Sequence, residues 1–304
     1  MSELGLGCAR IGGVFQGDSQ SFVRLLAMAR DGGINFFDTA DMYSQGESEA
    51  LLGRVFRNRR SEVIINTKAG FCLSGRRKIA GRLKPLLRPV IQALGIRRDR
   101  LPQGAKGTIL QDYSPAYLKS ALEASLRRLR TDYVDSFQLH SPPLEVIERG
   151  EWEPALDSLK QAGKVRFYGI SCDSPEAALA ALRFPNVSLL QFGFSLLEPG
   201  ATEQVLPTAR AQGVACIARE CLGNGLLAKP NVDDLDLAPY CSSPQQVDQR
   251  KRQLADLRAQ AAERGVTMTR MALEYASRNE GVSVALIGAR TPQQLRRLLD
   301  EQPD

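Results

Sequence analysis

The sequence predicts a single α/β domain folded as a (β/α)8 TIM barrel, and three observations support this prediction. The chain has 304 residues, of which 43% are hydrophobic, so it can bury one large core. Eight short apolar runs recur along the chain, with helix-forming segments between them. Four of these segments open with a hydroxyl residue followed by proline, which is a strong helix-start signal. We therefore expect residues 1–304 to form one barrel domain.

The eight apolar runs are expected to be parallel strands, because near-continuous hydrophobicity suits strands that are covered on both faces. In chain order they are LGLGCA at 4–9, INFFDTA at 34–40, EVIINTKAG at 62–70, YVDSFQLHS at 133–141, VRFYGISC at 165–172, SLLQFGFSL at 188–196, GVACIARE at 213–220 and SVALIGAR at 283–290. Eight such strands, with helices between them, are typical of a closed barrel.

The intervening helices have recognisable ends. A capping hydroxyl and a proline at the first helical position occur together at Ser114-Pro115, Ser174-Pro175, Ser243-Pro244 and Thr291-Pro292. Glycines fall where helices must stop and supply the positive φ of a left-handed C-terminal cap; they are Gly32-Gly33, Gly163 and Gly265.

Two connections, residues 71–113 and residues 222–246, are longer than ordinary loops between a strand and a helix. Both follow the carboxyl end of a predicted strand, where barrel enzymes place their active sites, so both are candidate walls for a substrate. An equally good interpretation of residues 222–246, which are rich in turn formers, is a lid without specific contacts.

Residues 73–111 hold ten Lys or Arg against one Asp and account for the formal net charge of +6. No aromatic residues are interleaved with this charge and no recognisable nucleic-acid module contains it, so we expect no nucleic-acid partner. We interpret this basic insertion as a solvated flap, as a cover for the cofactor pyrophosphate, or as a site for an anionic substrate.

No run approaches the roughly 20 apolar residues that a membrane span needs. Residues 1–17 hold no positively charged segment followed by an apolar stretch, so we expect no targeting segment. The six cysteines form no CxxC pair, and a single histidine cannot complete the usual zinc spacings. Asp233 and Asp234 also lack a ligand spacing. We therefore expect a cytoplasmic monomer with reduced thiols, no metal and no membrane contact.

Four polar residues stand at or just beyond the ends of three predicted strands: Asp38, Tyr43, Lys68 and His140, the only histidine. Each has an ordinary explanation when taken alone. Asp38 could cap a turn, Tyr43 could be a loop aromatic, Lys68 could be an ion-pair partner and His140 could lie in the core. Because a barrel brings the carboxyl ends of its strands to one mouth, we expect Asp38, Lys68 and His140 to lie around it.

Asp38, Tyr43, Lys68 and His140, in this order, resemble the catalytic tetrad of the aldo-keto reductases. The similarity runs from LGLG at residue 4 to GARTPQQ at 288–294 and includes ALEASLRRLRTDYVDSFQLH. It implies an NADPH-dependent oxidoreductase, with NADH possible, that reduces a small-molecule aldehyde or ketone to an alcohol. Tyr43 would protonate the carbonyl oxygen, Lys68 would lower the phenol pKa from about 10, Asp38 would hold Lys68, and His140 would orient the carbonyl.

The resemblance also implies contacts to the nicotinamide half of the cofactor. Ser171 and Gln191 match the family's residues near the nicotinamide amide, whereas Cys172 replaces the usual asparagine. Arg219 stands where many members stack an aromatic ring, and a guanidinium can also stack there. The same arginine could instead pair with Glu220 or with a loop carboxylate.

IGARTPQQL resembles the segment that binds the adenosine ribose phosphate, and the charge of Arg290 favours NADPH. Against this preference, Gln294 and Leu298 replace an arginine and an asparagine that are often found there. No GxGxxG fingerprint follows a strand, so the expected mode is not of the Rossmann type. The predicted cofactor-binding residues are Gly7, Cys8, Ala9, Asp38, Ser171, Cys172, Gln191, Arg219, Glu220, Leu222, Gly288, Ala289, Arg290 and Gln294.

Two other functions stay open at this point. Lys68 at the end of a barrel strand could form a Schiff base, as in an aldolase or lyase, although the neighbouring Asp38 would keep it protonated and poorly nucleophilic. The chain could also be a cofactor-binding regulatory module with weak activity. Cys172 and Arg219 leave room for that reading, whereas an intact Tyr43 speaks against it.

Overall fold

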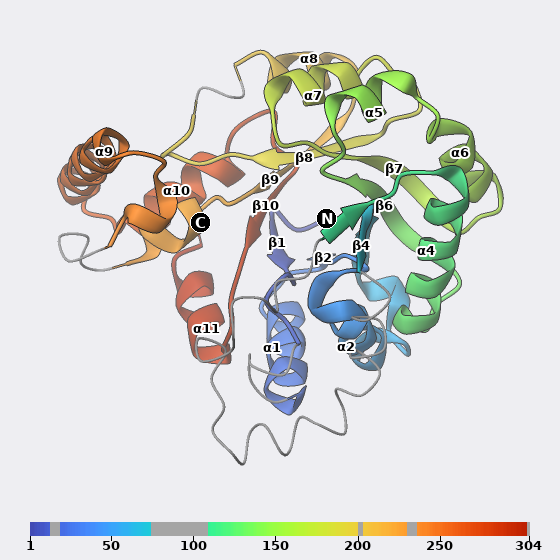
Figure 1. The fold of residues 1–304 in the computed structure, drawn as a ribbon. Helices are drawn as coiled ribbons and strands as arrows, with labels where there is room; N and C mark the ends of the chain where they lie inside the picture. Colours follow the sequence, from blue (N-terminus) through green and yellow to red (C-terminus); the bar gives the residue numbers. More distant parts are fainter. Residues whose placement is uncertain (13–18, 74–108, 200–202, 230–235, 303–304) are drawn as a thin grey trace, which may run out of the picture.

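The computed structural model describes residues 1–12, 19–73, 109–199, 203–229 and 236–302. Its centre is a closed barrel of eight parallel strands in the order β1-β10-β9-β8-β7-β6-β3-β2, surrounded by helices (Figure 1). All eight runs predicted as strands form this barrel, so the predicted fold class is confirmed. The strands are β1 (Leu4–Gly7), β2 (Phe36–Asp38), β3 (Ile64–Ala69), β6 (Val134–His140), β7 (Val165–Ser171), β8 (Leu189–Gly193), β9 (Ala215–Arg219) and β10 (Val284–Ile287).

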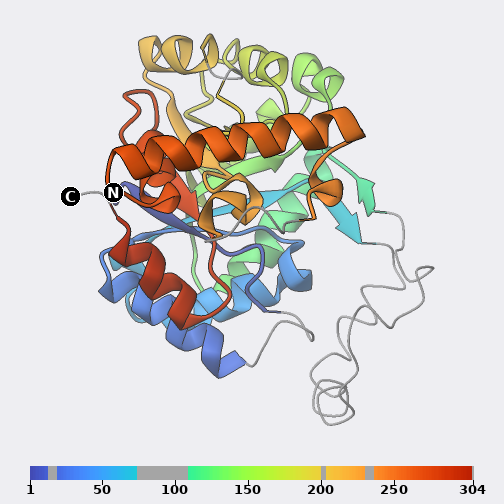
Figure 2. The ribbon, with the colours of Figure 1, turned by 90° about the vertical axis from the view of Figure 1, so that its left-hand side faces the viewer.

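The described α-helices lie outside the barrel, and Figure 2 shows α9 extending along its exterior. They are α1 (Ser19–Asp31), α2 (Glu47–Phe56), α4 (Pro115–Leu129), α5 (Leu144–Arg149), α6 (Glu153–Gln161), α7 (Pro175–Ala181), α8 (Val205–Ala211), α9 (Pro244–Glu263), α10 (Met268–Ser277) and α11 (Pro292–Asp300). Among the described residues, no helix combines the length and the apolar character needed to cross a bilayer.

The predicted helix ends are confirmed. A hydroxyl oxygen accepts a hydrogen bond from the backbone N–H three residues later at each predicted start, namely Ser114, Ser174, Ser243 and Thr291. The predicted stops have positive φ, with 91° at Gly33, 71° at Gly163 and 64° at Gly265.

The barrel interior is apolar at one level and polar toward the mouth. One buried cluster fills the apolar level with Phe36, Leu189, Ile217, Val284 and Leu286. Side chains alternate between the two faces of a strand, so the residues two positions further along β2 and β8 face the interior as well. These are Asp38 and Gln191, both buried, and they belong to the polar level that carries the candidate site.

The long segment 71–113 begins and ends with strands that the sequence prediction missed. β4 (Phe71–Leu73) and β5 (Ile109–Gln111) form an antiparallel pair outside the barrel sheet. Each is three residues long, too short to show an alternating pattern. Directly after β5, the Tyr113 hydroxyl donates a hydrogen bond to the His140 carbonyl oxygen at 2.7 Å, which fastens the pair to the barrel mouth.

Most of the basic insertion, residues 74–108, lies outside the described residues. In the second long segment, residues 222–246, the described parts contain two short 3-10 helices, η6 (Gly223–Ala228) and η7 (Ala238–Tyr240). Asp233 and Asp234 also lie outside the described residues. Within the described ranges, no three His, Cys, Asp or Glu side chains come together to hold a metal ion.

Candidate active site

Asp38 and Lys68 form a buried ion pair at the mouth of the barrel, on the adjacent strands β2 and β3. Lys68 Nζ lies 2.7 Å from Asp38 Oδ1 and donates a second hydrogen bond to the Thr39 carbonyl oxygen at 2.9 Å. Burial opposes the charged form of Lys68, but Asp38 and Tyr43 outweigh that effect and raise its pKa above the ordinary value. The lysine is therefore an ammonium near neutral pH.

Tyr43 opens a tight turn, η1 (Tyr43–Gly46), that leads into α2. Ser44 and Gln45 adopt left-handed φ values of 51° and 62°, which are uncommon for residues other than glycine. The Ser44 hydroxyl donates to the Ile11 carbonyl oxygen at 2.9 Å and ties this turn to the segment after β1. The turn leaves Lys68 Nζ 5.1 Å from the centroid of the Tyr43 ring.

The pKa of Tyr43 reflects two opposing effects. Burial raises this pKa above its ordinary value, and the charge of Lys68 lowers it. The lysine thus acts in the direction that the sequence analysis expects. The net shift is nevertheless upward, because loss of solvent around the phenol is the larger effect, and burial of this kind cannot be deduced from residue order.

His140, the last residue of β6, packs edge-on against two aromatic rings. Its centroid lies 5.6 Å from that of Tyr43 and 4.8 Å from that of Phe71. Burial, with the positive charges of Lys68 and Arg219, lowers the pKa of His140 to about 2. The imidazole is therefore neutral at physiological pH. Its Nδ1 has no hydrogen-bond partner within the described part of the chain.

Two buried residues that the sequence analysis did not single out support the ion pair from inside the barrel. The Asn66 side-chain amide donates to Asp38 Oδ1 at 2.6 Å, and the Ser136 hydroxyl donates to Asn66 Oδ1 at 2.7 Å. A signal for them exists, because Asn66 precedes Lys68 by two residues and Ser136 precedes His140 by four, so each shares a strand face with a tetrad member.

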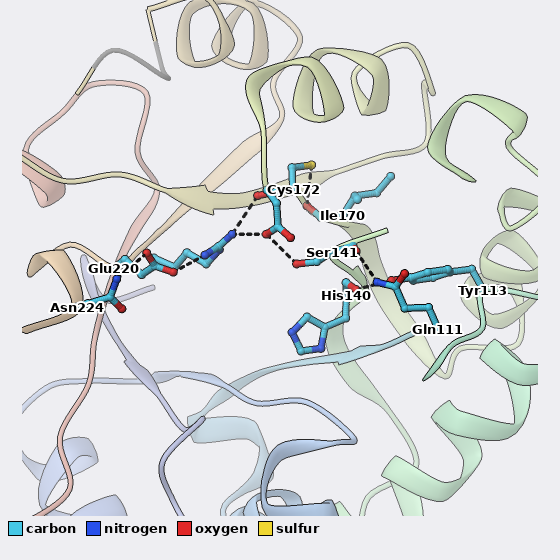
Figure 3. Close-up of polar contacts among 10 residues, drawn as sticks. Gln111, Tyr113, His140, Ser141, Ile170, Cys172, Glu220 and Asn224 are labelled. Carbon is cyan, nitrogen blue, oxygen red and sulfur yellow. Dashed lines mark hydrogen bonds and ion pairs between the residues drawn. The ribbon is translucent and has the colours of Figure 1, made fainter. Parts of the chain in front are cut away.

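Arg219 is the last residue of β9. Figure 3 shows polar contacts in this region, with Glu220 on one side and Ser141, next to His140, on the other. The Arg219 guanidinium lies 2.5 Å from an Asp173 carboxylate oxygen and 2.5 Å from a Glu220 carboxylate oxygen. Asp173 in turn accepts a hydrogen bond from the Ser141 hydroxyl at 2.9 Å. The salt-bridge alternative for Arg219 is thus present, with Asp173 as a second partner beside Glu220.

Ser171 and Gln191 lie beside His140 at the carboxyl ends of neighbouring strands. Ser171 pairs in register with His140 on one side and with Gln191 on the other. Gln191 Oε1 is buried and has no partner among the described residues. The Cys172 thiol contacts the Ile170 carbonyl oxygen at 3.7 Å, and the Cys172 backbone N–H donates to the Gln191 carbonyl oxygen at 2.7 Å. Cys172 therefore supports Gln191 through its backbone.

The remaining predicted cofactor residues occupy the ends of β1, β9 and β10 and the segments that follow. Next to Gly7, the Cys8 backbone N–H donates to the Asp38 carbonyl oxygen at 2.7 Å, which places Cys8 and Ala9 beside the tetrad. The others are Leu222, at the start of η6, and Gly288, Ala289, Arg290 and Gln294, around the start of α11. The Gln294 side chain accepts a hydrogen bond from the Arg290 backbone N–H at 2.9 Å, so Gln294 closes that turn. Arg290 is exposed and carries a positive charge at the same turn.

Comparison with known proteins identifies the family. The family model described as Aldo/keto reductase family matches residues 3–301. The chain is 29% identical over 301 residues to the uncharacterized oxidoreductase YqkF of Bacillus subtilis (strain 168), covering 97% of this chain and 85% of the relative. A holo-form aldo-keto reductase structure from Bacillus halodurans is 28% identical with a TM-score of 0.76, covering 99% of this chain and 86% of that one. The glycerol dehydrogenase structure from Gluconobacter oxydans is 26% identical with a TM-score of 0.79, covering 100% and 87%. This chain therefore belongs to the aldo/keto reductase family.

Proposed function

We propose that this chain reduces an aldehyde or ketone to the corresponding alcohol with NADPH, and that Tyr43 is the proton donor. One observation carries the proposal. A phenol, an ammonium paired with a carboxylate, and a neutral imidazole meet at one barrel mouth. The centroid of the Tyr43 ring lies 5.1 Å from Lys68 Nζ and 5.6 Å from the centroid of the His140 ring.

The residues at the mouth suit a nicotinamide group. Gln191 Oε1 is a buried acceptor without a partner among the described residues, and an amide N–H would satisfy it. Ser171 lies next to it in register and offers a hydroxyl. When bound there, the reduced nicotinamide supplies a hydride to the carbonyl carbon.

Side chains of the protein then stabilise and protonate the carbonyl oxygen, on which negative charge develops. Tyr43 gives its proton to that oxygen, and the ammonium of Lys68 stabilises the phenolate that remains. Neutral His140 donates a hydrogen bond to the same oxygen and orients the carbonyl. Asp38 holds Lys68 in its charged form. The reverse sequence oxidises an alcohol, with the Tyr43 phenolate as the base.

The choice of NADPH rests on Arg290, which stands exposed one residue before the cap of α11. A 2′-phosphate at this place would gain a charge-assisted hydrogen bond and the N-terminal dipole of the helix. Gln294 is engaged with the backbone of the same turn, so the selectivity for NADPH over NADH should come mainly from this one arginine.

The structure speaks against the Schiff-base alternative for Lys68. Its ammonium is held by Asp38 and by the Thr39 carbonyl oxygen, and it also interacts with the Tyr43 hydroxyl. A charged and fully engaged amine is a poor nucleophile. An aldolase would lose activity when borohydride and substrate are added together without cofactor, whereas a reductase would not.

We further propose that the protein works as a cytoplasmic monomer on a small molecule. All four tetrad residues come from one chain, and the six cysteines are unpaired. A screen of NADPH oxidation against aldehydes, keto sugars and quinones, repeated with NADH, tests the proposed activity. Alcohol oxidation belongs in the same screen, because the Gluconobacter oxydans relative is by name a glycerol dehydrogenase. Binding of NADPH without turnover of any carbonyl or alcohol would favour a regulatory module instead.

A further inference from the structure

A chain of buried hydrogen bonds runs beneath the tetrad across three neighbouring strands. It begins at Ser136 on β6, passes through Asn66 on β3 and ends on Asp38 of β2, with contacts of 2.7 and 2.6 Å. The strand register places Asn66 opposite both Ser136 and Asp38. Asn66 is completely buried, and the other two are at most 5% exposed. The contacts are therefore shielded from competing water.

The chemistry of the two ends fixes the orientation of the Asn66 amide. An ionised carboxylate can only accept hydrogen bonds, so the amide nitrogen of Asn66 must face Asp38. Asn66 Oδ1 then faces Ser136, whose hydroxyl donates to it. Asp38 Oδ1 consequently receives two donors, the Asn66 amide at 2.6 Å and Lys68 Nζ at 2.7 Å.

We propose that Asn66 is a positioning residue that controls, through Asp38 and Lys68, how readily Tyr43 gives up its proton. Its amide neutralises part of the charge on the carboxylate oxygen that holds Lys68. Without that amide, Asp38 would attract the ammonium more strongly away from Tyr43 and would repel the phenolate more strongly. Both changes make the phenol a weaker acid. The kinetic consequences of this proposal rest on the proposed function.

The charged and titratable groups that act on Tyr43 are Lys68, Asp38, Arg219 and His140. Of these four groups, Asn66 makes its hydrogen bond to Asp38, so its replacement acts on Tyr43 mainly through that carboxylate. Replacing Asn66 with leucine keeps the side-chain size and removes both hydrogen bonds. We expect Asn66→Leu to lower kcat about tenfold, the effect of losing one hydrogen bond to a charged group, with less than a threefold change in NADPH affinity.

The pH dependence of alcohol oxidation shows whether Asn66 positions the tetrad or only supports the fold. Alcohol oxidation needs the Tyr43 phenolate, so its rate rises as the pH approaches the pKa of that phenol. In Asn66→Leu this rise should move to higher pH by about half a unit to one unit. Thr67→Val is the matched control, because Thr67 is equally buried on β3 but its side chain lies on the opposite face of the strand, where its hydroxyl donates to Glu49 at 2.6 Å. This control should keep the parent's pH profile.

Asn66→Asp is a second variant, and its side chain has the same shape as the native asparagine. A carboxyl group at this position can donate to Asp38 only when it carries a proton, and two adjacent carboxylates share one proton readily. The activity of Asn66→Asp relative to the parent should therefore rise as the pH falls, whereas that of Asn66→Leu should not. An identical pH trend in the two variants would count against the proposal.

A direct titration of Tyr43 tests the proposal without any turnover. The ultraviolet tyrosinate signal of the parent minus that of Tyr43→Phe reports Tyr43 alone, and the same difference is measured in the Asn66→Leu background. An upward shift supports the proposal even if no carbonyl substrate is found, so failure of the proposed function is recognised separately. If Asn66→Leu is less stable to heat but leaves this titration and the pH profile unchanged, Asn66 serves only the fold and the proposal is wrong.

Discussion

The ring of Tyr43 stands edge-on to the ring of His140, with centroids 5.6 Å apart and an angle of 82° between the planes. A carbonyl oxygen held at these two rings would receive one hydrogen bond from the phenol and one from the imidazole. The phenol and the imidazole differ in whether they can transfer a proton to that oxygen. The pKa of His140 is lowered to about 2, so the imidazole carries no additional proton to transfer near neutrality. This difference supports the proposal that Tyr43 is the proton donor and His140 the orienting group.

This division of roles predicts that no histidine ionisation affects carbonyl reduction. A pH profile of kcat/KM between about pH 5 and pH 9 should lack an inflection near the ordinary histidine value of about 6.5. His140→Asn retains a hydrogen-bond donor and should lower kcat/KM by roughly ten- to a hundredfold without changing the shape of the profile. An inflection near pH 6.5 that disappears in this variant would show that the histidine titrates during catalysis.

Variants of the buried ion pair between Asp38 and Lys68 should affect stability and activity differently. Lys68→Met leaves the Asp38 carboxylate buried without its cation, and we expect a loss of about 3–5 kcal/mol in the free energy of unfolding together with loss of turnover. The double variant Asp38→Asn/Lys68→Met removes both charges and should recover most of the stability but no activity. Denaturant unfolding and turnover of all three proteins check this. A double variant no more stable than Lys68→Met would contradict the prediction.

Asp41, which lies between two tetrad members in the sequence, should make stability depend on pH. Burial, and next the charge of Glu49, raises its pKa from 3.8 to about 7, although Tyr117 and Arg128 act in the opposite direction. The folded protein therefore keeps this proton up to about pH 7, whereas the unfolded chain releases it near 3.8. Folding binds a proton in that window, so stability falls as the pH rises through it.

Asp41→Asn should remove this effect, because an asparagine side chain does not titrate, and it can still accept the hydrogen bond of the Tyr117 hydroxyl. Relative to the parent, the variant should gain roughly 2 kcal/mol in the free energy of unfolding on going from about pH 5 to about pH 8. Urea unfolding of both proteins at the two pH values measures the difference. Parallel pH dependence in the two proteins would mean that Asp41 is not the responsible group.

Cofactor selectivity should depend on Arg290. Arg290→Ala should weaken NADPH binding about tenfold, because one charge-assisted hydrogen bond to the 2′-phosphate is lost, and should change NADH binding less than twofold. Quenching of protein fluorescence gives both dissociation constants without turnover. Equal losses for the two cofactors would place the 2′-phosphate elsewhere.

The barrel and the members of the tetrad could be predicted from the sequence because each depends on local information. An apolar run shows a covered strand, and a charged or imidazole side chain near the end of the run shows which residue reaches the mouth. Asp38, Lys68 and His140 are all found in this way. Tyr43 required the family resemblance, because its position depends on the turn that Ser44 and Gln45 form with left-handed φ values.

Contacts between strands could not be predicted in the same way. The bond from Asn66 to Asp38 and the ion pair from Arg219 to Asp173 depend on the register and on side-chain directions that join distant parts of the chain. The β4–β5 pair was missed because its two strands are short and far apart in the sequence. The upward shift in the Tyr43 pKa was missed because it comes from burial, which only the packed fold determines.

The most direct test of the central claim compares the parent protein with Tyr43→Phe on a carbonyl substrate found in the screen. The variant should bind NADPH within about twofold of the parent, because the hydroxyl acts on the carbonyl oxygen, and its kcat should fall by at least about a hundredfold. A phenylalanine variant that reduces the carbonyl as fast as the parent would show that the proton comes from another group.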